Sequence, residues 1–139
     1  MGEGTITTTE WSEITWDGKP ADELASGVTL VAVTASIDGT IEGVVTDRWL
    51  MSYTTPGVAE FTGLTQVSGT VAGRSGTVVL RHVGQMTNGD LRSDFVVVAG
   101  SGTGELADLT GSGTITFTAQ QGLTRYTFDA SFAVGRDKS

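Results

Sequence analysis

Residues 26–53 read SGVTLVAVTASIDGTIEGVVTDRWLMSY, and this stretch decides the fold class. Thr, Val and Ile are frequent on both sides of Asp38-Gly39, and these β-branched residues favour strands. The Asp-Gly dipeptide supplies the positive φ angles of a two-residue hairpin turn. The sequence therefore predicts a β-hairpin whose two long strands cover residues 26–37 and 40–53.

Similar Thr- and Val-rich segments recur along the rest of the chain, separated by short turn motifs. The least strand-like stretch is TWDGKPADELASG, where we expect a turn at Asp17-Gly18 and one helical turn at 21–26. The other turns are expected at Pro56-Gly57, 73–75, Asn88-Gly89 and Gln121-Gly122. The remaining predicted strands are 4–11, 59–64, 66–72, 76–86, 91–98, 112–119 and 124–134.

The composition agrees with an all-β fold. The chain has 139 residues with Gly 20 and Pro 2, a length and composition that suit one domain, residues 1–139, of short strands and tight turns. About eight or nine antiparallel strands with little helix can form either a closed barrel or a two-sheet sandwich. The residue pattern leaves both open, and only a barrel of about eight strands implies room for one small ligand.

The charge and the cysteine content exclude several classes of partner. The net charge of −8 arises from 8 Lys+Arg against 16 Asp+Glu, so nucleic acid and anionic membranes are not expected as partners. With Cys 0, neither disulfides nor thiolate metal sites can form. The first residues lack the features of a signal peptide, and no apolar stretch has membrane-spanning length, so we expect a soluble, cytoplasmic protein.

One motif resembles a nucleotide-binding loop. Residues 96–107, VVVAGSGTGELA, contain G-x-G-x-x-A after a valine run. A dinucleotide fold also needs a long helix, a second parallel strand and an acid about 20 residues further on, and none of these follows. The glycines are instead expected to form a connection at one end of a β-structure, with a short helical turn at 105–108.

The chain also resembles a known family. The segments that carry the resemblance are IEG (41–43), LMSY (50–53), FTGL (61–64), SGT (68–70), GRSG (73–76), LRH (80–82) and GSGTGEL (100–106). Together they resemble the bacterial family called domain of unknown function 3224. This resemblance implies a small, calycin-type barrel like that of plant allene oxide cyclases and dirigent proteins, with a ligand cavity inside. It also implies cyclase or isomerase activity in secondary metabolism.

The only histidine, His82, lies in TVVLRHVGQ, where a strand places it on one face with Val78 and Leu80. Two interpretations stay open. His82 is a core residue satisfied by a neighbouring hydroxyl or carbonyl, or it is a general acid or base. A metal site is not expected, because a single histidine without cysteine would need carboxylates for every other ligand.

A second candidate face is formed by Asp47, Trp49, Met51 and Tyr53, which alternate along one strand. It is either a core face or the wall of a pocket. In a pocket, Trp49 and Tyr53 would hold an apolar substrate, and burial would raise the pKa of Asp47 so that it could act as a base.

These faces yield a functional hypothesis: a cofactor-independent cyclase or isomerase that acts on a small, largely apolar, reactive substrate. Asp47, His82 and Tyr53 are the expected catalytic residues. Expected substrate-binding residues are Trp49, Met51, Leu80, Tyr126 and Phe128, the last two from the alternating strand RYTFDASFAV. No cofactor is expected, and a homo-oligomer is possible. The alternatives are a lipocalin-like carrier that performs no chemistry and a barrel filled by its own side chains. Separately, Trp11 and Trp16 are expected to cap one mouth of the barrel.

Overall fold

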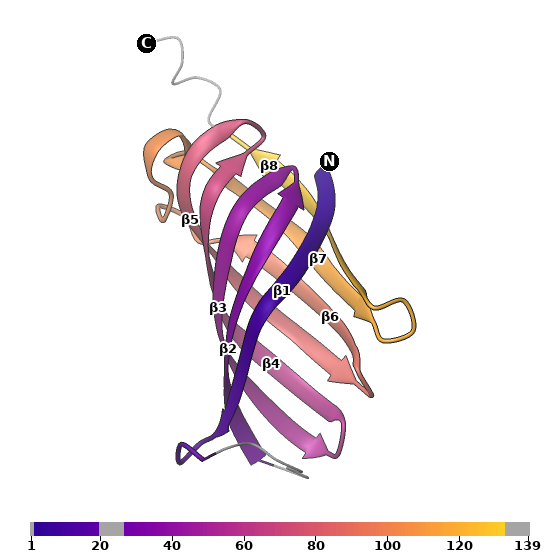
Figure 1. The fold of residues 1–139 in the computed structure, drawn as a ribbon. Helices are drawn as coiled ribbons and strands as arrows, with labels where there is room; N and C mark the ends of the chain where they lie inside the picture. Colours follow the sequence, from indigo (N-terminus) through magenta and orange to yellow (C-terminus); the bar gives the residue numbers. More distant parts are fainter. Residues whose placement is uncertain (1, 20–26, 133–139) are drawn as a thin grey trace.

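Eight antiparallel strands close into one barrel in the computed structural model, which describes residues 2–19 and 27–132 (Figure 1). Each strand pairs with the next one in sequence, and β1 pairs with β8 to complete the ring. The closed ring decides between the two all-β architectures in favour of the barrel. The elements are β1 (Gly2–Thr15), β2 (Gly27–Gly39), β3 (Ile41–Thr55), β4 (Val58–Val71), β5 (Arg74–Thr87), β6 (Asp90–Val97), the short 3₁₀ helix η1 (Gly104–Leu106), β7 (Thr110–Thr118) and β8 (Leu123–Ser131).

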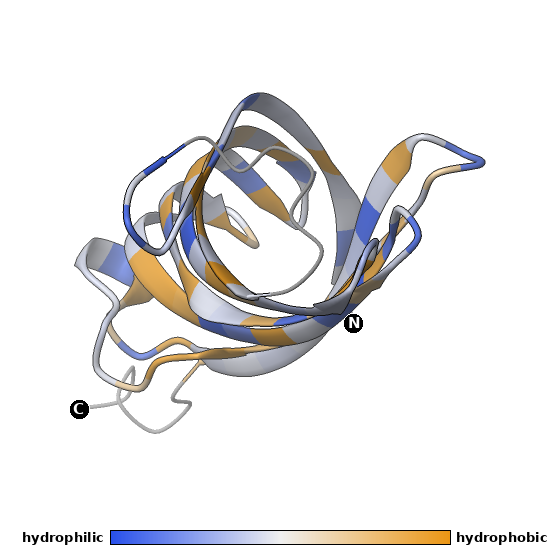
Figure 2. Cartoon of the chain, turned by 90° about the horizontal axis from the view of Figure 1, so that it is seen from below, coloured by the Kyte–Doolittle hydropathy of each residue, from blue (hydrophilic) through white to orange (hydrophobic). Residues whose placement is uncertain are grey.

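Strand alternation sends one set of side chains to the interior of the barrel. Figure 2 shows the ring of strands around this interior, seen from below. On β3 the buried or half-buried residues include Ile41, Val45, Asp47, Trp49 and Met51, and the residues between them face solvent or are less buried. The predicted face of Asp47, Trp49 and Met51 is therefore confirmed as an interior face.

One prediction about the middle of the chain needs correction. The pattern predicts separate strands at 59–64 and 66–72, but these residues form the single strand β4, in which Thr65 pairs with Asp47. Thr65 has high strand propensity and no turn residue flanks it, so nothing in the local sequence breaks the ladder. The helical turn expected at 105–108 is η1, Gly104–Leu106, and the turn expected at 21–26 lies outside the described residues.

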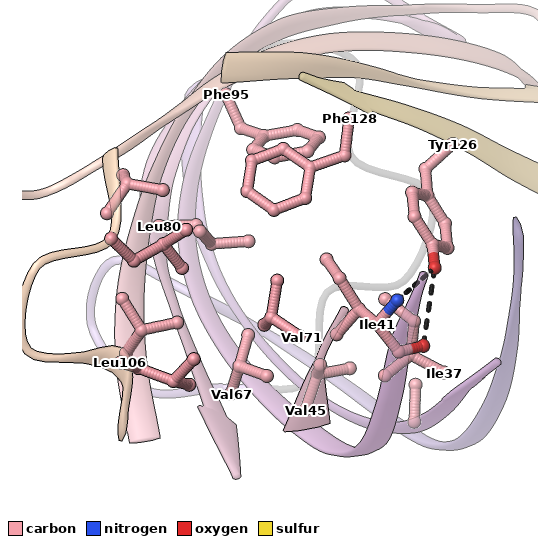
Figure 3. Packing of buried hydrophobic residues seen from close by; sticks show 14 residues of the cluster. Ile37, Ile41, Val45, Val67, Val71, Leu80, Phe95, Leu106, Tyr126 and Phe128 are labelled. Atoms are coloured by element: carbon pink, nitrogen blue, oxygen red, sulfur yellow. Dashed lines mark hydrogen bonds between the residues drawn. The ribbon is translucent and has the colours of Figure 1, made fainter. Parts of the chain in front are cut away.

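The predicted hairpin at Asp38-Gly39 is confirmed, but its two-residue turn is wrong. Ile37 pairs with Gly43, which leaves a longer connection, and only Gly39 of the dipeptide has a positive φ, of 106°. The hydroxyl of Tyr126 fills this connection: it accepts a hydrogen bond from Ile41 N at 2.8 Å and lies 2.8 Å from Asp38 O, to which it donates. Figure 3 shows the Tyr126 hydroxyl directed at the Ile41 backbone.

Strand β1 contains an irregularity that changes which residues face inward. The register with β2 shifts between Thr8 and Glu10, so Thr9 is an extra residue in the ladder. Before the shift Ile6 and Thr8 face Ile37 and Ala35, and after it Trp11 faces Val33. Without this bulge, strict alternation would turn Trp11 outward.

Two clusters of buried residues pack inside the barrel. The larger cluster includes Ile41, Val67, Phe95, Leu106 and Phe128, and Figure 3 shows Phe95 beside Phe128. The smaller cluster contains Val31, Val33, Met51, Ala59 and Phe61, with Trp49 packed against it.

In four places the ring of an interior aromatic residue occupies the space that a side chain would take on the glycine opposite it. The pairs are Trp49 with Gly63, Phe61 with Gly84, Phe95 with Gly113 and Tyr126 with Gly4. A Cβ atom added at any of these glycines would lie within 2.7 Å of an atom of the opposing ring, a distance too short for two carbons. Each ring therefore depends on the missing side chain of its partner.

The Tyr126 contact predicts a stability effect. Replacing Tyr126 with Phe removes the acceptor of the Ile41 N–H inside the barrel, so the free energy of unfolding should fall by about 1–3 kcal/mol. Urea denaturation would measure it. Tyr53→Phe is the matched control and should cost less, because the Glu13 carboxylate that accepts from Tyr53 keeps its bond from Thr29. Wild-type stability in Tyr126→Phe would contradict the structural role assigned to this hydroxyl.

Candidate functional site

A cavity of about 390 Å³ lies inside the barrel, and residues of both core clusters line it. This volume is within the range of small-molecule sites, near its lower end. The walls come from all eight strands and the turn after β5, and the exposed lining residues Thr8, Trp11 and Gly89 mark its opening. Its lining consists of Ile6, Thr8, Trp11, Val33, Ala35, Ile37, Ile41, Val45, Asp47, Trp49, Thr65, Leu80, His82, Met86, Gly89, Leu91, Ser93, Phe95, Ile115, Phe117, Thr124 and Tyr126.

The opening coincides with an incomplete seam in the barrel. Strand β1 pairs with β8 only from Gly2 to Ile6, whereas its pairing with β2 continues to Thr15. Figure 1 shows β1 running on beyond the point where β8 begins. The second half of β1, which carries Trp11, therefore has no strand on its other edge among the described residues, and this edge borders the cavity opening.

Four buried polar side chains form a row across one wall of this cavity. Asp47, Thr65, His82 and Ser93 come from the consecutive strands β3, β4, β5 and β6, and all four are at most 8% exposed. Asp47 lies directly opposite Thr65. Thr65 pairs with Leu80, two residues before His82. His82 pairs with Phe95, two residues after Ser93. Side chains at these direct and diagonal positions on one sheet face are close enough to interact.

Hydrogen bonds join the four residues of this row into one chain. The Thr65 hydroxyl bonds both to Asp47 Oδ1 and to His82 Nε2. On the other side of the imidazole, His82 Nδ1 is 3.1 Å from Ser93 Oγ. Both ring nitrogens of His82 are therefore satisfied, and the Thr65 hydroxyl links the carboxyl group to the imidazole.

Burial shifts the two titratable members of the row in opposite directions. It raises the pKa of Asp47 to about 6, although the Thr65 hydrogen bond and the Arg48 charge act to lower it. It lowers the pKa of His82 to about 4. At neutral pH the wall thus carries a carboxylate at Asp47 and an uncharged imidazole at His82.

Aromatic rings cover the wall beside Asp47 and His82. Trp49 stacks on Phe61 with ring centroids 5.0 Å apart, and Trp11 meets Trp49 edge-on at 5.6 Å. The Trp49 and His82 rings are 6.5 Å apart. The cavity therefore combines one polar row with aromatic and aliphatic walls, an arrangement typical of sites that orient an apolar molecule.

The structure brings together five of the eight residues expected at the site. Asp47, Trp49, Leu80, His82 and Tyr126 line the cavity. The other three, Met51, Tyr53 and Phe128, do not line it, and Met51 and Phe128 are buried among core residues instead. Of the two tryptophans expected at the barrel mouth, Trp11 lines the cavity, while Trp16 is 70% exposed.

The hydroxyl of Tyr53 is part of a different cluster. It donates to Glu13 Oε2 at 2.7 Å, and Thr29 donates to the same oxygen at 2.6 Å. Burial and the neighbouring Glu13 raise the pKa of Tyr53 above its ordinary value. Since this hydroxyl faces Glu13, it is separate from the row of Asp47 and His82.

Sequence reasoning missed Thr65 and Ser93. It places a break between two strands at Thr65, and it assigns no role to Ser93. Alternation alone locates both, since FTGLTQV puts Thr65 on the face of Phe61 and Val67, and LRSDF puts Ser93 on the face of Phe95. Their connection to His82 requires the strand register.

The described part of the chain contains neither a metal-binding cluster nor a membrane-spanning helix. Among residues 2–19 and 27–132, no three His, Cys, Asp or Glu side chains are placed to hold a metal ion. Within the same ranges, no helix has the length and apolar character needed to cross a bilayer.

Comparison with known proteins assigns the family. The family model described as "Protein of unknown function (DUF3224)" matches residues 2–130, which is nearly the whole chain. The chain belongs to the DUF3224 family. The predicted resemblance of the chain to this family is therefore confirmed.

A solved DUF3224 structure has the same fold. The crystal structure of a DUF3224 protein of unknown function from Shewanella oneidensis superposes with a TM-score of 0.77 at 26% identity, covering 96% of this chain and 98% of the other. No match was found among curated proteins. The expected relation of this DUF3224 barrel to allene oxide cyclases and dirigent proteins stays a prediction.

The opposed pKa shifts of Asp47 and His82 predict how folding depends on pH. Between about pH 4 and 6, folded Asp47 keeps a proton that it loses on unfolding, so its contribution to stability falls as pH rises through this window. Folded His82 is neutral and gains a proton on unfolding, so its contribution rises with pH over a similar window. In the wild type the two slopes should nearly cancel.

Substituting one of the two residues should reveal how the other makes the free energy of unfolding depend on pH. From pH 4 to 6, His82→Gln should lose about 2 kcal/mol of unfolding free energy relative to the wild type, and Asp47→Asn should gain a similar amount. Urea denaturation at several pH values would test this. Curves parallel to the wild type in both variants would show that neither group titrates differently in the folded and unfolded chains.

Proposed function

We propose that the barrel is a cofactor-independent isomerase or cyclase that binds a small, largely apolar substrate in its interior cavity and moves a proton on it. The observation that carries the proposal is the row of Asp47, Thr65, His82 and Ser93 on one wall of an otherwise mainly apolar cavity. A carrier of apolar ligands gains nothing from burying a carboxylate, which costs free energy in an apolar interior. Acid–base catalysis does need such a group.

Asp47 is the proposed base. With a pKa of about 6 it is largely ionised at neutral pH, yet it is basic enough to take a proton from an activated C–H or O–H bond. The substrate's electron pair then moves into a neighbouring double bond or oxygen. Return of the proton at a different atom completes an isomerisation without net change of protons or electrons.

The Thr65–His82–Ser93 segment can supply a second proton path. When Asp47 is ionised, Thr65 donates to Asp47, His82 Nε2–H donates to Thr65, and Ser93 donates to His82 Nδ1. When Asp47 is protonated, all three hydrogen bonds can reverse. A proton taken up at Ser93 can thus be delivered at Asp47 by a shift along the chain, and both ends of this path lie in the cavity lining.

The walls would provide the selectivity. Trp49, Trp11 and Leu80 confine the substrate beside Asp47, so that one reactive conformer is favoured over others. This division of roles, with shape from the apolar walls and proton transfer from the polar row, agrees with the cyclase or isomerase expectation from the sequence.

Hydrogen–deuterium exchange tests the proposed chemistry with simple ketones in place of the natural substrate. Neutral apolar ketones such as 1-tetralone and 2-acetylnaphthalene are incubated with the protein in deuterium oxide, and mass spectrometry follows deuterium incorporation at carbon. The wild type should accelerate exchange, and Asp47→Asn should lose at least about 100-fold of this acceleration. Asp94→Asn, which removes a carboxylate that is 72% exposed, is the matched control and should keep it.

No exchange or isomer formation with any ketone that binds would remove the catalytic proposal and leave a carrier of apolar ligands. Acceleration that persists in Asp47→Asn would remove Asp47 as the base.

The pH dependence of the exchange rate tests the same assignment. Because the base is the ionised form of Asp47, kcat/KM should rise about tenfold per pH unit below the pKa of about 6 and level off above it. The measurement is the initial exchange rate between pH 4.5 and 8 at low ketone concentration. A profile that falls with rising pH over this range would instead indicate that protonated Asp47 is the active form.

A further inference from the structure

The Asp47 carboxylate lines the cavity without a cationic partner. Both ion pairs found within the described residues lie elsewhere, on the surface. Arg48, the next residue on β3, donates to the backbone carbonyl of Asp47 at 2.8 Å rather than to its carboxylate. The side-chain partner of the carboxylate is the neutral hydroxyl of Thr65. A cation that enters the cavity would therefore supply the opposite charge that this buried group lacks.

No second charge lines the cavity together with Asp47, as far as the described residues go, because the other lining residues include no Lys, Arg, Asp or Glu. The imidazole of His82 is uncharged near neutral pH, since burial lowers its pKa to about 4. The lining hydroxyls of Thr8, Thr65 and Thr124 can bond to charged and uncharged ligands alike. Selection of a ligand by its charge therefore depends on Asp47.

Two tryptophan rings lie near the carboxylate on the interior face of the barrel. Trp11 pairs with Val33, and Val33 pairs with Asp47, so these residues form one row across three strands. The spacing of strands places the Cα atoms of Trp11 and Asp47 about 10 Å apart, close enough for one small group to contact both side chains. Trp49 follows Asp47 by two residues on β3, and its ring meets that of Trp11 at 5.6 Å with the ring planes 79° apart. The two indoles thus form a corner beside Asp47.

This corner lies close to solvent. The Trp11 side chain is 46% exposed at the cavity opening, and Asp47, in the same row, is 8% exposed. A charged group can approach Asp47 from the opening without crossing the whole apolar interior, which limits the cost of removing it from water. The net charge of −8 also attracts cations to the protein and repels anions.

We infer that the cavity binds small apolar molecules that carry one ammonium group, with the ammonium held between the Asp47 carboxylate and the Trp11 and Trp49 rings. The carboxylate offers a charge-assisted hydrogen bond, and an indole face attracts cations more strongly than the other aromatic side chains do. An anion of the same shape would instead meet the Asp47 charge with no compensating cation. Arylalkylamines, which have an aromatic group, a short linker and an amine protonated at neutral pH, fit this description.

The inference goes beyond the proposed function, although it uses the same cavity. An ammonium ion paired with Asp47 occupies the group proposed as the base. A bound amine should therefore prevent removal of a proton from a ketone and act as a competitive inhibitor of the exchange reaction. Binding of amines does not require that the barrel be a catalyst, so the two proposals can fail separately.

Three naphthalene probes of similar size test the selection by charge. They are 2-naphthylmethylamine, which is an ammonium ion at pH 7.5, 2-naphthalenemethanol, which has a hydroxyl in the same place, and 2-naphthoate, which is an anion. Isothermal titration calorimetry on the full chain at pH 7.5 measures each affinity. The amine should bind about tenfold more tightly than the alcohol, and 2-naphthoate should bind most weakly.

Two variants connect this order to the proposed contacts. Asp47→Asn removes the charge with little change of shape, so it should abolish the preference for the amine while changing the affinity of the alcohol by no more than about threefold. Trp11→Leu should reduce the ratio of amine to alcohol affinity about two- to fivefold, because only the cation loses an attraction to the ring electrons. The matched controls, Asp94→Asn and Trp16→Leu, are at exposed positions and should leave the ratio unchanged. Thermal unfolding verifies that each variant is folded.

Equal affinities of the amine and the alcohol, tightest binding of 2-naphthoate, or an amine preference that survives either Asp47→Asn or Trp11→Leu would overturn the inference. Absence of binding by the amine would do the same. Exchange into 2-acetylnaphthalene that the amine does not inhibit would overturn the inference and leave the proposed function. The expected binding pattern without any ketone exchange would uphold the inference and remove the catalytic proposal alone.

Discussion

The packing of aromatic rings over glycines of the next strand controls how the interior of this barrel is filled. Trp49 over Gly63 and Phe95 over Gly113 are two examples, and in each the ring occupies the space that a partner side chain would take. Each of these rings fills space next to a glycine of the neighbouring strand. The middle of the barrel thus stays open as a cavity, although eight-stranded barrels are narrow enough to be filled completely by side chains.

The same constraint explains why polar groups are tolerated in the interior. Asp47, Thr65, His82 and Ser93 follow one another across strands β3 to β6, so each finds its partner on the neighbouring strand and each hydrogen bond crosses one gap between strands. The spacing between neighbouring strands therefore sets the spacing between the side chains of the row. A buried carboxyl group and a buried imidazole thereby remain hydrogen-bonded on rigid strands. Loops would position these two side chains less accurately.

Strand alternation makes much of this predictable, and strand register sets the limit. The pattern in residues 26–53 predicts the paired strands and the shared face of Asp47, Trp49 and Met51, and TVVLRHVGQ places Leu80 and His82 together. The register between neighbouring strands decides which residues of the two strands lie opposite each other. The local sequence does not encode this register. For this reason sequence reasoning missed the links of Thr65 and Ser93 to His82, and also the bulge in β1 that turns Trp11 inward.

The longer connection between β2 and β3 was beyond local prediction for a related reason. Its backbone is held by Tyr126, which is 85 positions from Ile41 in the sequence. A turn motif such as Asp38-Gly39 indicates where the chain reverses, but a distant side chain decides how many residues the reversal takes.

The incomplete seam between β1 and β8 has a consequence for how the barrel assembles. Seven of the eight strand pairings join neighbours in sequence and can form as local hairpins, whereas β1 and β8 come from opposite ends of the chain. Closing so long a loop carries a larger entropic cost than forming a hairpin, so this pairing is expected to form late. The Tyr126 contact with the β2–β3 connection forms across the same boundary. An incompletely synthesised chain would therefore hold most of the sheet without an enclosed interior, and the cavity would form only when the final strand is present.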